Sequence, residues 1–127
     1  MTKIGIVGAN GRMGRAIAEI IGETPQMTLV GGIDRDDGDL AALAGAADVL
    51  IDFSPPAALA ATLAAARAAG TAIVIGTTGL EARHHDLIDA AAADIAVLQT
   101  GNTSLGVNLL AHLVRDVAAR LGEDWDI

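Results

Sequence analysis

The chain begins with Lys3-Ile4-Gly5-Ile6-Val7-Gly8-Ala9-Asn10-Gly11-Arg12-Met13-Gly14, and this stretch decides the fold class. The apolar run at its start predicts a buried strand, and the residues from Arg12 onwards predict a helix. The glycines between them permit a tight turn, let the backbone approach a ligand and let the helix pack closely on the strand. The N–H groups at the start of such a helix are free to bind an anion. The stretch therefore predicts that a nucleotide diphosphate binds in the first turn of the protein.

Strands and helices alternate along the rest of the chain. After the strand at 3–7, further strands are predicted at 27–33, 48–52, 72–75 and 95–99, and helices at 12–22, 39–44, 57–69, 81–92 and 105–121. Asp39 and Ser54 are expected to cap the helices that follow them, and Gly70 and Gly122 to end helices. This alternation is typical of right-handed β-α-β units. It predicts a single α/β domain over residues 1–127, with a Rossmann-like, doubly wound parallel sheet in a three-layer α/β/α arrangement.

The composition excludes several classes of function. The chain has 127 residues, of which 52% are apolar and only 2% aromatic, so aliphatic side chains must form the core. Its net charge of −8 argues against nucleic-acid binding, which depends on Lys and Arg. The absence of cysteine excludes disulfides, a thiolate nucleophile and cysteine metal sites. Neither a signal-peptide pattern nor an apolar run of about 18 residues is present, and a cytoplasmic location is expected.

Polar and glycine-rich segments follow every predicted strand. In a parallel sheet of this class, ligands bind beyond the carboxyl ends of the strands. Five separate segments are therefore expected to meet at one edge of the sheet, namely residues 8–14, 34–35, 52–54, 76–79 and 100–104.

Asp34 and Arg35 end the second predicted strand. An acid at this position is suited to accept hydrogen bonds from the adenosine ribose hydroxyls, which favours NAD, whereas Arg35 could pair with the 2′-phosphate of NADP. The alternative is that Asp34 only begins an acidic turn. Arg12 could similarly reach a phosphate or remain a solvated helix residue.

The segments after the third and fourth strands offer contacts for the other end of a nucleotide. Gly76-Thr77-Thr78-Gly79 provides hydroxyls and open N–H groups that suit a ribose or a carboxamide, although a simple turn is the alternative. Phe53 could pack on a bound ring or belong to the core. Asp52 could be no more than a turn residue or an acid at a helix start.

No catalytic or metal-binding residues are predicted. His84 and His85 are adjacent on a helix, point in different directions and are expected at the surface. His112 lies beside an apolar helix face and is expected to be structural. No Ser-His-Asp arrangement, carboxylate pair or metal cluster can be assembled from the sequence.

Taken together, these segments resemble 4-hydroxy-tetrahydrodipicolinate reductase, the dihydrodipicolinate reductase family of bacterial lysine biosynthesis. The matching segments extend over essentially the whole chain, and they are Gly8-Ala9-Asn10-Gly11-Arg12-Met13-Gly14, Asp34-Arg35, Val49-Leu50-Ile51-Asp52-Phe53-Ser54-Pro55-Pro56, Gly76-Thr77-Thr78-Gly79 and Asn102-Thr103-Ser104-Leu105-Gly106-Val107-Asn108. This combination is far more specific than a glycine fingerprint alone.

The resemblance implies an NAD(P)H-dependent oxidoreductase that transfers hydride to a cyclic dicarboxylate. It assigns the diphosphate to residues 8–13, the adenosine ribose to Asp34 and the NADP phosphate to Arg35. It assigns the nicotinamide end to residues 76–78 and 100–103. The implied cofactor-binding residues are Gly8, Ala9, Asn10, Gly11, Arg12, Met13, Asp34, Arg35, Gly76, Thr77, Thr78, Thr100, Gly101, Asn102 and Thr103.

The sequence departs from this family in three respects. Asn10 stands where the family usually has glycine, and Thr103 where it often has an aromatic residue. The family also continues into a substrate domain with a Glu-x-x-x-His-His-x-x-Lys signature, which is absent from these 127 residues. The chain is therefore expected to be the NAD(P)-binding domain alone, to bind NADH or NADPH without turning over the dicarboxylate, and to self-associate through exposed apolar surface. The alternatives are a CoA-binding or other nucleotide-binding Rossmann module without redox activity, and an interaction protein with a vestigial pocket.

Overall fold

A computed structural model describes residues 1–34 and 38–122. Arg35 lies outside the described residues. The elements follow in the order β1 (Thr2–Val7), α1 (Arg12–Glu23), β2 (Met27–Ile33), α2 (Leu40–Ala46), β3 (Val49–Asp52), the 3-10 helix η1 (Pro56–Ala58), α3 (Leu59–Ala69), β4 (Ala72–Ile75), α4 (Ala82–Ala92), β5 (Val97–Gln99) and α5 (Leu105–Leu121). The predicted strands and helices are all present, with bounds that differ by a few residues.

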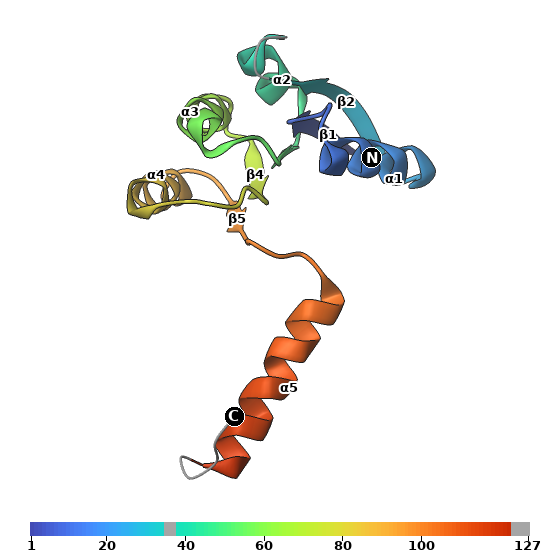
Figure 1. Cartoon of the computed structure of the whole chain (residues 1–127). Helices are drawn as coiled ribbons and strands as arrows, with labels where there is room; N and C mark the ends of the chain where they lie inside the picture. The colour runs from blue at the N-terminus through green and yellow to red at the C-terminus, as the bar shows by residue number, and fades with distance from the viewer. Residues whose placement is uncertain (35–37, 123–127) are drawn as a thin grey trace.

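The five strands form one parallel sheet in the order β2-β1-β3-β4-β5 (Figure 1). β1 lies between β2 and β3, and Ile6 pairs with Gly32 on one side and with Ile51 on the other. From β1 the chain adds β2 on one side, then crosses back to add β3, β4 and β5 on the other side. The carboxyl ends of β1 and β3 therefore border the crevice in which such folds bind ligands. The predicted Rossmann-like α/β architecture is confirmed.

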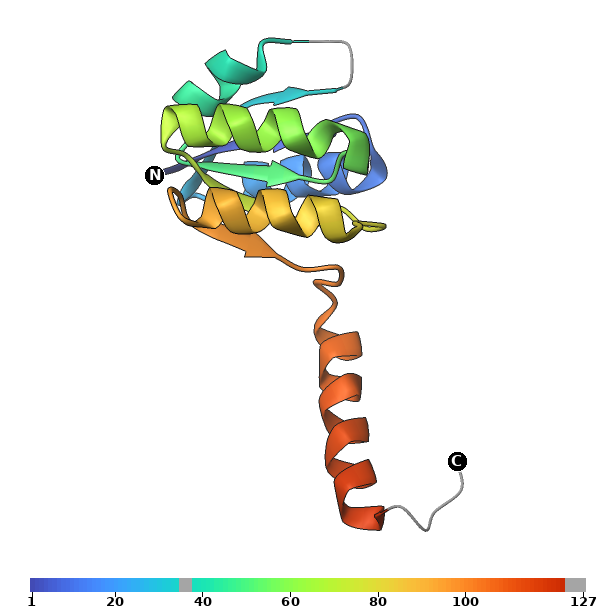
Figure 2. The same ribbon diagram turned by 90° about the vertical axis from the view of Figure 1, so that its left-hand side faces the viewer.

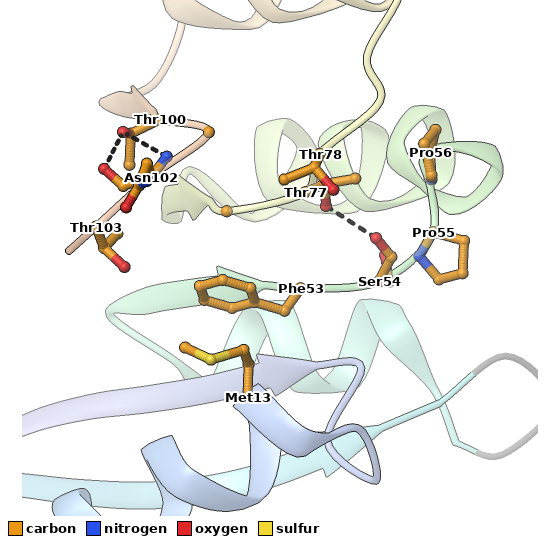
Figure 3. Close-up of a pocket in the computed structure, with 12 residues that line it drawn as sticks. Met13, Phe53, Ser54, Pro55, Pro56, Thr77, Thr78, Thr100, Asn102 and Thr103 are labelled. Carbon is orange, nitrogen blue, oxygen red and sulfur yellow. Dashed lines mark hydrogen bonds between the residues drawn. The ribbon is translucent and has the colours of Figure 1, made fainter. Parts of the chain in front are cut away.

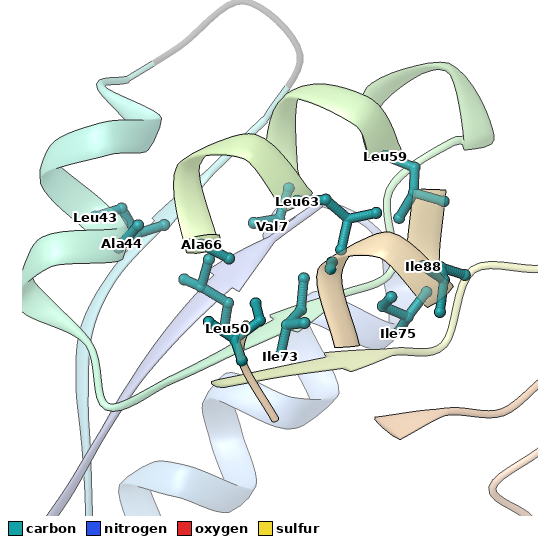
Figure 4. Close-up of a cluster of buried hydrophobic side chains, with 12 residues drawn as sticks. Val7, Leu43, Ala44, Leu50, Leu59, Leu63, Ala66, Ile73, Ile75 and Ile88 are labelled. Carbon is teal, nitrogen blue, oxygen red and sulfur yellow. The ribbon is translucent and has the colours of Figure 1, made fainter. Parts of the chain in front are cut away.

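The larger core lies between the sheet and the helices α2, α3 and α4. Successive side chains of a strand point to opposite faces, so alternate strand residues enter this core. Figure 4 shows Leu50, Ile73 and Ile75 of the sheet packed against Leu63 and neighbouring side chains of these helices. The remaining buried members of this cluster are Val7, Leu43, Ala44, Leu59, Ala66, Ile88, Ala91 and Ile95.

Among residues 1–34 and 38–122, the opposite face of the sheet is covered only over β1 and β2. There α1 packs on β1 and β2 around Ile4, Ile6 and Ile21. Helix α5 leaves the end of β5 and extends away from the sheet, as both views show (Figure 2). Leu98 of β5 is consequently 59% exposed. Of the helices that the structure describes, none is long and apolar enough to cross a membrane.

Of the two predicted N-terminal helix caps, the structure contains one and lacks the other. The Asp39 carboxylate accepts hydrogen bonds from the N–H groups of Ala41 and Ala42, both at 3.0 Å, and so caps α2 as predicted. The prediction that Ser54 caps a helix is wrong. Pro56 has no N–H to donate, and the chain instead forms the short helix η1 before α3 begins at Leu59.

The prediction for His84 is also wrong. His84 is buried, and its Nδ1 accepts a hydrogen bond from the Glu81 N–H at 2.8 Å. It therefore satisfies a backbone donor at the start of α4, a role usually filled by Glu or Gln. His85 is exposed, as predicted.

Candidate nucleotide-binding site

The turn after β1 requires glycine at two positions. Gly8 has a φ of +85°, and a Cβ there would lie 3.0 Å from the backbone of Phe53 and from Ser54 N. At Gly14, a Cβ would lie 2.3 Å from the carbonyl oxygen of Gly8. The first glycine therefore allows the left-handed turn, and the second allows α1 to pack directly against it.

The start of α1 is open towards this turn. Gly11 is the N-cap residue and supplies no capping side chain, and the first turn of α1 contains no acidic residue. The first N–H groups of a helix have no partner within the helix and carry partial positive charge. Arg12 and Met13 are exposed at the same end. This arrangement suits an anion such as a diphosphate.

Asn10 replaces the usual middle glycine without strain. Among the described residues, only glycines have positive φ, so Asn10 lies in an ordinary backbone conformation. Its N–H donates a 2.7 Å hydrogen bond to Oδ2 of Asp34. This bond links the glycine turn to the end of β2 and orients the Asp34 carboxylate.

Asp34 lines a cavity of about 450 Å³ between the glycine turn and the start of α3. The rest of its lining is mainly apolar, which suits a flat ring beside a polar ribose. The lining residues are Val7, Gly8, Ile33, Asp34, Gly38, Leu40, Ser54, Pro55, Ala57, Ala58, Ala61 and Thr62.

A second cavity, of about 580 Å³, opens beyond the carboxyl ends of β3, β4 and β5. Figure 3 shows Met13 and Phe53 on one side of it and Thr100, Asn102 and Thr103 on another. The half-buried Phe53 ring packs against the backbone at Gly76, where a Cβ would lie 2.3 Å from the ring. Phe53 thus serves both packing and the cavity wall, which were alternatives on sequence grounds.

The predicted site residues divide between these two cavities and the turn that joins them. Eight line the larger cavity, namely Met13, Gly76, Thr77, Thr78, Thr100, Gly101, Asn102 and Thr103. Gly8 and Asp34 line the smaller cavity. Ala9, Asn10, Gly11 and Arg12 form the turn and the start of α1 without lining either cavity.

Sequence reasoning placed residues 52–54 at the ligand-binding edge but assigned no cofactor contact to Ser54 or Pro55, although both line each of the two cavities. The only signal was their position directly after a strand, in a segment that was interpreted as a helix start. It also missed the apolar wall of the smaller cavity, because small apolar residues carry no distinctive chemistry.

Asp52, at the end of β3, is fully buried. Its Oδ1 accepts a 2.7 Å hydrogen bond from the Ser54 N–H. Burial away from water raises the pKa of the Asp52 carboxyl above its usual value, and the neighbouring Ser54 hydroxyl, the Ser54 N–H and the Thr62 hydroxyl oppose part of that rise. The carboxyl is therefore a structural element of the turn rather than an exposed turn acid.

The loop before α5 is held by its own side chains. Asn102 Oδ1 accepts a 2.8 Å hydrogen bond from the Ser104 N–H, and Ser104 Oγ accepts one of 3.3 Å from the Val107 N–H. Thr100 Oγ1 donates to the Asn102 carbonyl at 3.0 Å. These bonds shape the cavity wall and cap α5. Within residues 1–34 and 38–122, no group of three or more acidic or histidine side chains is placed to hold a metal ion.

Comparison with known proteins adds a family to this geometry. The family model described as "Dihydrodipicolinate reductase, N-terminus" matches residues 2–103. The chain is 50% identical over 131 aligned positions to 4-hydroxy-tetrahydrodipicolinate reductase of Zymomonas mobilis, covering 98% of this chain and 51% of the relative. It is 46% identical to the enzyme of the same name from Caulobacter vibrioides, covering 98% of this chain and 52% of the relative.

Solved structures show the same fold. Dipicolinate-bound dihydrodipicolinate reductase from Paenisporosarcina sp. TG-14 superposes with a TM-score of 0.76 at 21% identity, over 94% of this chain and 54% of the other. Apo saccharopine dehydrogenase from Saccharomyces cerevisiae superposes with a TM-score of 0.71 at 15% identity, over 94% and 32% respectively.

The chain spans about half the length of the curated relatives that it matches. The family match nevertheless covers the glycine turn, Asp34 and all the residues that line the two cavities. The chain therefore belongs to the family of dihydrodipicolinate reductase N-terminal domains, the dinucleotide-binding domains of these oxidoreductases.

Proposed function

We propose that this domain binds NADH or NADPH and presents the nicotinamide ring for hydride transfer. The observation that carries the proposal is the position of the uncapped start of α1 beside two cavities, one containing Asp34 and the other lined by threonines. A dinucleotide has a diphosphate flanked by two nucleosides, and this order matches the order of the three features.

The adenosine half is assigned to the smaller cavity. Ile33, Leu40 and Ala61 would contact the adenine ring, and Asp34 would accept hydrogen bonds from the ribose hydroxyls. The diphosphate is assigned to the N–H groups of Gly8 to Met13, with Arg12 close enough in sequence to add a positive charge. Arg35 is proposed to bind the additional phosphate of NADPH.

The nicotinamide half is assigned to the larger cavity. Thr77, Thr78 and Asn102 offer hydrogen-bonding groups for a carboxamide and a ribose, while Met13 and Phe53 offer apolar contact for the ring. When bound, the cofactor supplies the hydride, and the domain's part is to place and orient it.

The reaction of the whole relatives is proposed to be reduction of the cyclic dicarboxylate intermediate of lysine and diaminopimelate biosynthesis. The 127 residues contain no Glu-x-x-x-His-His-x-x-Lys run, and no residue in them is assigned as a proton donor or dicarboxylate ligand. We therefore expect this polypeptide to bind the cofactor without oxidising it in the presence of substrate. A cytoplasmic location follows from the same proposal, because biosynthetic reductions draw on the cytoplasmic NAD(P)H pool.

Self-association is proposed as a consequence of exposed apolar surface. Five apolar residues spaced by three or four positions along α5 are between 40% and 60% exposed, namely Val107, Leu110, Val114, Val117 and Leu121. A stripe of this spacing is typical of a helix that packs against another surface. A second copy of the chain offers a matching apolar surface.

Replacement of Asp34 tests the assignment of the adenosine ribose. Asp34→Ala should weaken NADH binding by about tenfold or more, because a hydrogen bond to a charged group contributes about 1.5–3 kcal/mol. Asp89→Ala, a change on the exposed surface of α4, should leave the affinity unchanged. Titrations that follow NADH fluorescence provide the comparison.

Two results would contradict the proposal. The first is equal NADH affinity in the wild type and Asp34→Ala. The second is robust oxidation of NADPH by the 127-residue chain that depends on the dicarboxylate substrate, since this would require a proton donor that the assignment lacks.

A further inference from the structure

One face of the sheet is apolar over β3, β4 and β5, and no helix within residues 1–34 and 38–122 covers it there (Figure 1). Leu50 and Ile73 enter the core beneath α3, so Ile51 and Val74, the residues that follow them, point to the other face. Ile51 pairs with Val74, and Val74 pairs with Leu98. These three side chains form an apolar row across the strands, named here the β3–β5 row. Leu98, at its outer end, is 59% exposed. Parallel sheets normally have both faces covered, so the row indicates a surface that receives another element.

Helix α5 has the shape and polarity of such an element. Every residue from Leu105 to Leu121 is exposed. The five apolar side chains spaced by three or four positions, named here the α5 stripe, run along one side of the helix. The polar side includes Arg115 and the ion pair of Arg120 with Asp116, which joins Nε and Oδ2 at 3.2 Å. An amphipathic helix of this kind is stabilised by packing its apolar side on another surface while its polar side stays in water.

The loop before α5 holds the helix away from its own sheet. The Thr100 N–H donates to the Ile75 carbonyl at 3.0 Å and so ties the end of β5 to β4. In α5, Asn108 Nδ2 donates to the carbonyls of Asn102 and Ser104 at 3.2 and 3.0 Å. These bonds connect the sheet, the loop and the first part of α5, and the helix leaves in a direction that takes it off the sheet (Figure 2). The open face of each chain is therefore free to receive α5 of another chain.

Exchange of α5 between two copies buries enough surface for a specific dimer. The helix has 17 residues. It is therefore about 26 Å long and about 10 Å wide. Counted on both sides of each contact, two such helices remove roughly 1,000 Å² from water, which is near the lower limit for a specific interface. Each copy gives one helix and receives one, so the arrangement closes at two chains, as in a two-fold symmetric dimer.

We propose that α5 of one chain docks through the α5 stripe onto the β3–β5 row of a second chain, and that the second chain returns its own α5 to the first. This inference rests on the self-association proposed above, and it names the two surfaces that meet. It also explains why a helix and a sheet face that are both apolar stay uncovered in a single chain.

Disulfide cross-linking tests the contact directly, because the chain itself contains no cysteine. Leu98→Cys on the sheet is mixed in turn with one of three variants of the α5 stripe, and each mixture is oxidised. The three variants are Leu110→Cys, Val114→Cys and Val117→Cys. At least one mixture should give a disulfide-linked pair of the two different chains as its main covalent product. Arg115→Cys, on the polar side of α5, should give little of this product with Leu98→Cys.

A charge in the β3–β5 row provides a second test. Leu98→Glu enters the proposed dimer twice and should raise its dissociation constant by about tenfold or more, since each carboxylate would be buried against apolar side chains. Leu87→Glu adds the same charge at a 41% exposed position on α4, which covers the opposite face of the sheet, and should change the dissociation constant by less than about twofold. Both positions are exposed, so both variants should keep the wild-type Tm at concentrations where the chains are monomeric. Analytical ultracentrifugation measures the dissociation constants.

The outcomes separate this contact from other modes of association. Cross-links of Val114→Cys with itself, without any to Leu98→Cys and with unchanged dimerisation of Leu98→Glu, would overturn the inference and leave the proposed self-association intact. A disulfide within single chains of the double variant Leu98→Cys with Val114→Cys, and no linked pairs in the mixtures, would also overturn it, because α5 would then cover its own sheet. A wild type that stays monomeric at high concentration would overturn both the inference and the self-association.

Discussion

At the scale of single residues, Gly14 has the most restrictive environment in the glycine turn. Its hydrogen faces the Gly8 and Ala9 carbonyl oxygens, and a Cβ would lie 2.3 and 2.6 Å from them. Both obstacles are backbone atoms, so they cannot move aside as a flexible side chain could. The close contact between α1 and the turn therefore depends on this one glycine.

Two glycines of α1 form a matched pair for testing this contact. Gly14→Ala should lower the free energy of unfolding by about 1–3 kcal/mol through overpacking, and should weaken cofactor binding by displacing the turn. A Cβ at Gly22 would meet nothing within 4 Å, so Gly22→Ala should raise the free energy of unfolding by about 0.5–1 kcal/mol. Urea unfolding measures both changes. Equal effects of the two substitutions would contradict the packing argument.

Asp52 gives a prediction about pH. Burial raises the pKa of its carboxyl in the folded state, so the folded protein binds this proton more tightly than the unfolded chain does. The contribution of Asp52 to stability therefore increases as pH falls from neutral towards the unfolded-state pKa. Asp52→Asn resembles the protonated acid and lacks this dependence. The Tm of Asp52→Asn minus that of the wild type should consequently decrease between neutral and mildly acidic pH.

Calorimetric scans of both proteins across this pH range provide the check. All other carboxylates are common to the two proteins, so their effects cancel in the difference. A difference in Tm that grows as pH falls would show that the folded state favours the charged form of Asp52.

Single residues could be predicted where both their chemistry and their position after a strand indicate a use. They could not be predicted where their surroundings depend on segments that are distant in the sequence. The place of Asp34 in the smaller cavity could be predicted because an acid at the end of the second strand lies at the edge where such sheets bind ligands. The position of Ser54 at both cavities could not, because it depends on contacts of residues 53 and 54 with Val7, Gly8 and Thr77, which are far apart in sequence.

At the scale of elements, the third residue of α4, His84, helps to cap the start of its own helix. His84 Nδ1 accepts the Glu81 N–H, which would otherwise be unpaired at a partly buried helix start. His84→Ala should lower the free energy of unfolding by about 1 kcal/mol, as expected for loss of a cap. His85→Ala, on the exposed side of the same helix, should change it by less than about 0.5 kcal/mol. Equal effects in thermal unfolding would argue against the capping role.

The order and type of the elements were predictable from local patterns. Apolar runs predict the strands, and Gly70, with a φ of +69°, ends α3 as predicted. The start of α3 was not predictable by the usual capping rule. The Asp52 carboxylate accepts the Ser54 N–H and so forms a turn at this point. The two prolines that follow begin the 3-10 helix η1, which precedes α3.

At the scale of the whole molecule, α5 is the feature that the sequence left undetermined. Its amphipathic pattern predicts a helix with one apolar face, but the pattern does not identify the surface against which that face packs. In the structure the helix extends away from the sheet, and its apolar side chains are exposed (Figures 1 and 2). The exposure of an apolar helix face was among the expectations from sequence.

This exposure leads to a prediction about assembly. The wild-type chain should form dimers or larger species as its concentration rises, and the combined change Leu110→Glu with Val114→Glu should reduce this association. Arg115→Glu alters the net charge by the same amount on the polar side of α5 and should have little effect. Light scattering at several concentrations measures the mass. A strictly monomeric wild type at high concentration would contradict the prediction.

We propose that this domain binds a nicotinamide dinucleotide through the glycine turn, Asp34 and the two cavities beside them. Calorimetric titration of the 127-residue chain with NADH, NADPH and CoA measures this binding. We expect saturable binding of NADH or NADPH with one site per chain, and much weaker binding of CoA. Tight binding of CoA without binding of either nicotinamide cofactor, or no nucleotide binding at all, would contradict it.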